Sequence, residues 1–171
     1  MKSFHYSIDD VFSTLVYASD NKLSLIELPF FKTLRQLYDD FGVCTNLYTF
    51  GRAVIAGELR TLHDITSFKE DLREGWLKFG VHAADFDTPP YAQPVLDNIS
   101  TFSDMHSQLI RLSGGCMSSS IRLHYYSECF ELADFFLQRN IKELFTTDKP
   151  ARCYRLPENC RLNLERQGST D

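Results

Sequence analysis

The sequence has no hydrophobic run long enough to cross a membrane, which takes about 20 consecutive apolar residues. Its first residues, Met1 to Tyr6, lack the apolar core of a signal peptide. The phosphate-binding patterns G-x-x-x-x-G-K-[ST] and G-x-G-x-x-G are absent too, so Gly114-Gly115 is not interpreted as a phosphate loop. The lack of a membrane span and of a signal peptide predicts a cytoplasmic protein with no membrane partner.

Paired cysteines are also missing. The five cysteines are odd in number, and no two of them form a C-x-x-C pair. A disulfide framework needs an even set, and a zinc ribbon needs C-x-x-C pairs, so neither is expected. Cys44 and Cys129 fall on apolar faces and are interpreted as small core residues.

Positive charge is in deficit, because 18 Lys and Arg stand against 23 Asp and Glu, for a formal net charge of −5. Nucleic acids and anionic membranes are bound through excess positive charge, so neither is predicted as the main partner. Apolar residues, in contrast, make up 43% of the chain, which excludes a disordered protein. A chain of 171 residues with this composition suits a single domain over residues 1–171.

Strand-like and helix-like segments alternate along the chain. Strands are predicted at the apolar run from Phe4 to Ile8 and at 43–50, 77–82, 118–125 and 141–145. Helices are predicted to end at Gly42 and at Gly114-Gly115, with others at 67–76 and after Ser127. This β–α–β–α order predicts an α/β fold with a mostly parallel sheet and alternating helices. A closed eight-stranded barrel needs about 250 residues, so we expect an open or partial barrel, or a fragment of one.

Chemically capable residues stand where the predicted strands end. The first strand ends at Asp9-Asp10, and the 77–82 strand ends at His82. The 118–125 strand ends with Arg122 and His124 on one face, and the 141–145 strand ends near Asp148. Parallel strands end along one edge of a sheet, so these side chains are expected to converge on one cleft. Asp and His suit a divalent metal, a spare carboxylate suits a general base, and Arg122 could hold an anionic group or orient Asp9.

Simpler interpretations compete with the chemical ones. Asp9 and Asp10 could only cap the following helix, and His82 could be a hydrogen-bonded structural residue. Asp148 stands beside Lys149-Pro150 and could belong to a turn. The dipeptide recurs at Asp39-Asp40, where it is interpreted as a solvated helix end, so an Asp-Asp pair alone is not diagnostic.

Three segments occur in an informative order: Ser7-Ile8-Asp9-Asp10, Phe79-Gly80-Val81-His82 and Arg122-Leu123-His124-Tyr125-Tyr126. They resemble the first three motifs of the polysaccharide deacetylase family, and the resemblance covers most of residues 4 to 148. It implies a deformed or partial (β/α) barrel that removes an N-acetyl group from a sugar with a divalent metal, most simply zinc. By motif position, Asp9 is the base, Asp10 and His82 are metal ligands, and Arg122 orients Asp9.

The sequence departs from that family pattern in ways that matter for chemistry. A second metal-binding His normally follows four residues after the first; here that position is Phe86, and Asp85 or Asp87 is expected to replace it. In the third motif His124 stands where Pro is usual and Tyr126 where Gly is usual. The late Leu-x-His motif that supplies the general acid has no match after residue 148, and His124 is the candidate for that role. Either the chain stops before that motif, or the activity differs or is lost.

Three functions follow as alternatives. The first is a metal-dependent hydrolase acting on a small carbohydrate or another N-acylated substrate. The second is a non-catalytic relic of the fold that binds carbohydrate or a protein partner through Tyr91, Tyr125 and Tyr126. The third is a glycosidase that uses Asp9 and Asp85 as a carboxylate pair without a metal.

Overall fold

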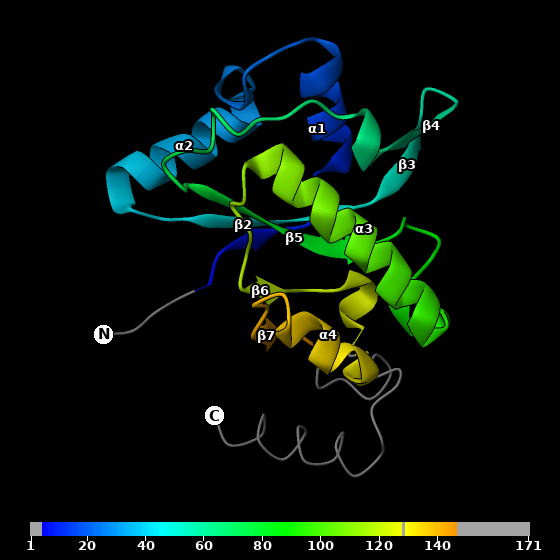
Figure 1. The fold of residues 1–171 in the computed structure, drawn as a ribbon. Coiled ribbons are helices and arrows are strands. Elements are labelled where there is room, and N and C mark those ends of the chain that lie inside the picture. Colours follow the sequence, from blue (N-terminus) through cyan, green and yellow to red (C-terminus); the bar gives the residue numbers. More distant parts are fainter. Residues whose placement is uncertain (1–4, 128, 147–171) are drawn as a thin grey trace.

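A computed structural model describes residues 5–127 and 129–146 of the chain. Its centre is a three-stranded parallel sheet in the order β1 (Ser7–Ile8), β2 (Thr45–Phe50), β5 (Leu77–Ala83), shown in Figure 1. Nearly every residue of β2 and β5 is buried, as expected for parallel strands covered on both faces. The predicted parallel α/β arrangement is therefore confirmed for this sheet.

Two smaller sheets flank the central one. The strands β3 (Arg52–Ile55) and β4 (Glu58–Thr61) form an antiparallel hairpin, whose turn residues Ala56 and Gly57 both have positive φ. The strands β6 (Ser120–Ile121) and β7 (Glu143–Leu144) pair in parallel, and a bridge between Phe79 and Met117 connects their layer to β5. The described strands form three open sheets, so a closed barrel is not what they build.

In the described part of the chain, four α-helices pack around these sheets: α1 (Phe12–Asp20), α2 (Pro29–Phe41), α3 (Val95–Ser113) and α4 (Ala133–Leu137). Figure 1 shows α1 and α2 above the central sheet and β6, β7 and α4 below it. Gly42 and Gly114 end α2 and α3 in the left-handed conformation, as their positions in the sequence predicted. Within residues 5–127 and 129–146, no helix has both the length and the apolarity needed to cross a membrane.

The core lies between the central sheet and the helices. Its largest fully buried side chains include Trp76, Tyr48, Phe12, Phe31, Phe79 and Phe102. They come from β2, β5 and α1 to α3 or the segments beside them, so the core joins the central sheet to these three helices. This packing fixes the C-terminal ends of the strands, where the polar side chains gather.

One predicted element is wrong and another is shorter than predicted. Residues 67–76 form turns rather than a helix, although Phe68, Leu72 and Trp76 recur at helical spacing and are all buried. In place of helical hydrogen bonds, Phe68 N donates to Leu112 O at the end of α3, and the Trp76 indole donates to Asp71 O within the segment. The strand predicted at 118–125 is reduced to Ser120–Ile121, and a 3-10 turn with a left-handed Tyr125 follows it.

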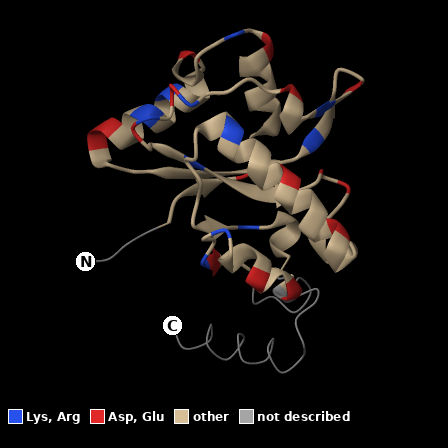
Figure 2. Cartoon of the chain, viewed as in Figure 1, with Lys and Arg blue, Asp and Glu red and all other residues tan. Residues whose placement is uncertain are grey.

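The second Asp-Asp pair is a solvated helix end, as predicted. Asp39 and Asp40 are exposed in the last turn of α2, where Asp39 accepts a hydrogen bond from Arg35 Nε at 2.9 Å. Figure 2 shows acidic residues at this end of α2 and basic residues earlier in the same helix. The arginine offsets the unfavourable effect of a carboxylate at a helix C-terminus.

Gly80 makes room for the Tyr48 ring against β5. A Cβ at position 80 would lie 2.8 Å from Cδ1 of Tyr48, whose side chain is fully buried. We expect Gly80→Ala to lower the free energy of unfolding by about 1–3 kcal/mol, measured by chemical denaturation. In a Tyr48→Leu background the same substitution should cost less; an equal cost in both backgrounds would contradict the steric explanation.

Candidate metal centre

Asp9 and Arg122 come together at the C-terminal ends of β1 and β6. Arg122 donates from Nη2 to Asp9 Oδ1 at 2.8 Å and from Nε to Asp9 Oδ2 at 3.0 Å. Both side chains are about three-quarters shielded from solvent, so this forked, charge-assisted pair holds the carboxylate in one orientation. The two residues are 113 apart in sequence, and the fold brings their side chains into direct contact.

His82 occupies an irregular position in β5. The register with β2 runs from Thr49 opposite Val81 to Phe50 opposite Ala83, so His82 is the extra residue of a bulge. Bulges re-aim side chains beside functional sites. The His82 ring is buried, and its Nδ1 lies 2.6 Å from the Arg122 carbonyl oxygen. A carbonyl only accepts hydrogen bonds, so Nδ1 carries the proton and Nε2 is left with a free lone pair.

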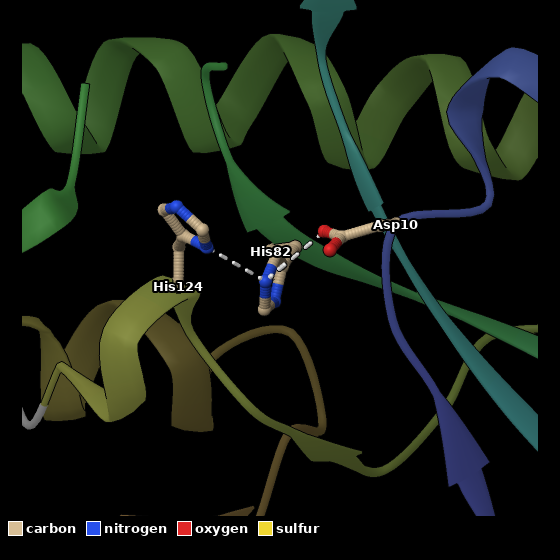
Figure 3. A group of neighbouring side chains, drawn as sticks. All are labelled: Asp10, His82 and His124. Carbon is tan, nitrogen blue, oxygen red and sulfur yellow. Dashed lines mark hydrogen bonds and ion pairs between the residues drawn. The ribbon is translucent and has the colours of Figure 1, made fainter. Parts of the chain in front are cut away.

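His124 is constrained in the same way from the other side. It begins the 3-10 turn after β6, and its Nε2 lies 3.2 Å from the Phe86 carbonyl oxygen. By the same reasoning Nε2 carries the proton and Nδ1 presents its lone pair. That Nδ1 lies 3.1 Å from His82 Nε2, and Asp10 Oδ1 lies 3.5 Å from the same His82 nitrogen (Figure 3).

Three acceptor atoms therefore converge without a donor between them. One ligand atom each from Asp10, His82 and His124 lies within 4.8 Å of the other two. Burial lowers the pKa of both imidazoles below the usual value, which opposes filling the gap with an extra proton. Neutral histidines whose other nitrogen donates to a backbone carbonyl are oriented as metal ligands are. A divalent cation fits this donor set.

Left-handed backbone surrounds the same site. Asp10, Tyr125 and Tyr126 have φ of 61°, 57° and 56°, in a region that non-glycine residues seldom adopt. All three line a cavity of about 410 Å³, together with Asp9, His82, Arg122, Leu123 and His124. Backbone in this region is strained, so it persists only where surrounding contacts hold it in place. Residues with such backbone cluster at functional sites.

The predicted site residues are brought together only in part. Asp9, Asp10, His82, Arg122 and His124 share one cavity, but Asp85 and Asp87 are not in the three-acceptor group. Asp85 instead pairs with Arg52 at 2.7 Å and accepts a hydrogen bond from Thr88 Oγ1. His124, predicted as a general acid, takes the third position of the donor set. Asp148 lies outside the described residues.

The simpler interpretation of the aspartates as helix caps is wrong. Val11 is the N-cap of α1, and no side chain makes a capping hydrogen bond there. Asp9 is turned to Arg122 and Asp10 to His82 instead. Both carboxylates therefore serve the cavity rather than the helix that follows them.

Phe50 is a neighbour of the site that the pattern of the sequence does not single out. Its ring meets the rings of His82 and His124 edge to face, with centroids 5.2 and 5.0 Å apart. It excludes water from one side of the imidazole pair and helps to fix both rings. A strand is predicted at residues 43–50. Phe50 ends that strand, and this position at the common C-terminal edge of the sheet is the signal that could have placed it near the site.

In comparisons with known proteins, the chain matches no model of a protein family, no curated protein and no solved structure.

Proposed function

We propose that this protein is a metal-dependent hydrolase that removes an N-acetyl or other N-acyl group from a carbohydrate, with the partial (β/α) barrel of the polysaccharide deacetylases as its scaffold. The observation that carries the proposal is the donor-free group of Asp10, His82 and His124 beside the Asp9–Arg122 pair. Zinc suits two imidazoles and a carboxylate. The resemblance of three ordered motifs supports the reaction type, which the donor set alone does not specify.

Each side chain has a separate role in this proposal. Asp10, His82 and His124 would hold the ion, which when bound polarises a carbonyl and lowers the pKa of a water ligand. Asp9, held by Arg122, accepts a proton from the attacking water. Because His124 is assigned to the ion, Asp9 is also the residue left to pass that proton to the departing nitrogen. The net reaction adds water across the amide and yields acetate and an amine.

The test is hydrolysis by the full chain loaded with zinc, cobalt or nickel. N-acetylglucosamine and its short oligomers would be the substrates, and released acetate and free amine would be quantified together. We expect equal amounts of both products, loss of activity on chelation and recovery on adding metal back. Stoichiometric metal with no hydrolysis of any N-acylated sugar, whether acetyl or a longer chain, would reject the hydrolase.

A non-catalytic carbohydrate-binding role is the second candidate. The Tyr125 and Tyr126 rings are exposed at the mouth of the same cavity, and the Tyr91 ring lies 6.5 Å from that of Tyr125. Exposed aromatic rings with a polar tip are suited to contact a sugar. Saturable binding of N-acetylglucosamine oligomers that persists in chelator, without acetate release, would favour this function over the first.

A further inference from the structure

A second cavity adjoins the candidate metal centre. It has a volume of about 550 Å³ and is lined by Asp10, which also lines the 410 Å³ cavity. Asp10 therefore stands between the two spaces, with His82 and His124 on one side of it. The second cavity falls within the 300–1,000 Å³ range of small-molecule sites, so a ligand bound at the centre has room to extend into it.

Exposed apolar side chains gather around this second cavity. Val54 and Leu59 are paired directly across the β3–β4 hairpin, and Phe86 comes from the loop after β5. Their exposed fractions are 69%, 61% and 59%, and all three line the cavity. Apolar residues scattered singly on a surface are ordinary, but three that converge on one hollow mark a place where apolar material binds.

The interior of the cavity is partly apolar, like the hairpin side chains at its rim. Phe12 and Phe50 form part of the lining and are buried, so apolar surface continues from the hairpin to the neighbourhood of the imidazoles. Of the four charged residues in the wall, Arg52 and Asp85 neutralise one another at 2.7 Å, which leaves the carboxylates of Asp10 and Asp87. The aliphatic pair on the hairpin has no hydrogen-bonding capacity for sugar hydroxyls. The apolar part of the wall, which runs from the hairpin to Phe50, fits a hydrocarbon better than a polyhydroxylated ring.

We propose that this cavity binds the acyl chain of the substrate, and that the chain is longer than acetyl. The inference rests on the proposed function, because it takes the amide carbonyl to lie at the Asp10, His82 and His124 group. From there the sugar side lies toward Tyr125 and Tyr126, and the acyl side passes Asp10 toward Phe86, Val54 and Leu59. The substrate class is an N-acylated amino sugar with a medium-length alkyl chain.

The experiment uses N-acetyl-, N-butanoyl-, N-hexanoyl- and N-octanoylglucosamine. Binding to the metal-free full chain is measured by calorimetry, and hydrolysis by the metal-loaded chain is measured separately. We expect affinity, and kcat/KM where hydrolysis occurs, to rise about two- to fourfold per added methylene. The Val54→Ser/Leu59→Ser double variant should flatten this dependence, and Leu59→Trp, which fills the cavity, should reverse it toward acetyl.

Leu96→Ser is the matched control, because Leu96 is an equally apolar side chain, 77% exposed, on α3 and outside the cavity lining. It should keep the wild-type dependence on chain length. Equal affinity for all four chains, or a dependence that survives both hairpin variants, overturns the proposal even if acetyl is hydrolysed. A chain-length dependence of binding without any hydrolysis rejects the proposed function alone. Self-association lost in the double variant, with no chain-length effect, overturns the proposal and assigns the surface to a second copy.

Discussion

Replacing His82 with alanine is expected to abolish stoichiometric metal binding. The substitution removes the central acceptor, since His82 Nε2 is the atom that faces both His124 Nδ1 and Asp10 Oδ1. Loss of a partner that only orients a ligand costs about 10- to 100-fold in metal affinity, so loss of the ligand itself should cost at least about 100-fold. Elemental analysis and zinc titration of the purified full chain would measure the change.

A second variant guards against a folding defect in the buried site. Asp10 has φ of 61°, which asparagine tolerates better than alanine, and its side chain is more than half exposed. Asp10→Asn should therefore fold normally and still weaken metal binding. His63→Ala is the control, because His63 faces a carboxylate, Asp104, at 3.0 Å but lies outside the three-acceptor group. Full metal binding in the His82 and Asp10 variants, or none in the loaded wild type, would contradict the assignment.

Replacing Asp9 with asparagine is expected to lower the rate of hydrolysis while leaving metal binding intact. The carboxylate oxygens of Asp9 are held by Arg122 and are not part of the metal group, so metal should still bind with a stoichiometry of about one. Hydrolysis should fall about 10²- to 10⁴-fold, the usual contribution of a positioned general base. The measurements are metal content and acetate release on the same preparation, with circular dichroism to verify folding.

The chain offers a matched control for this substitution. Asp39 is also the first residue of an Asp-Asp pair and also accepts from an arginine Nε, at 2.9 Å from Arg35, but it is exposed at the end of α2. Asp39→Asn should leave metal content and hydrolysis at wild-type values, with a stability change of about 0.5 kcal/mol or less. Unchanged hydrolysis in Asp9→Asn would falsify the role as base. Loss of metal in that variant would instead make Asp9 part of the binding site.

Much of the candidate site was predictable because it follows from local patterns and one topological rule. Apolar runs marked β1, β2 and β5 as strands, and parallel strands end at a common edge. Asp9, Asp10 and His82 therefore had to lie near one another once the strands were recognised. The helix predicted at residues 67–76 failed for the opposite reason. Phe68, Leu72 and Trp76 stand at helical spacing, but the same spacing also arises where side chains are buried from turns.

The hairpin and the bulge lay beyond this reasoning. Nothing in the pattern of residues 52–61 distinguished Val54 and Leu59 from ordinary exposed positions, and only their pairing brings them to one cavity. Likewise, the extra residue at His82 is defined by the register between β5 and β2, which is a relation between two strands. A regular pleat predicts side-chain direction from sequence, and a bulge changes that direction locally.

By itself, the sequence determined the chemical content of the site: two adjacent carboxylates after the first strand, an imidazole in β5, and a guanidinium after β6. The tertiary structure decided which groups form the donor set, placing His124 there and turning Asp85 toward Arg52. It also decided which imidazole nitrogens are free, through the carbonyls of Arg122 and Phe86. Those contacts join residues 40 and 38 positions apart, and hydrogen bonds over such separations depend on packing rather than on local propensity.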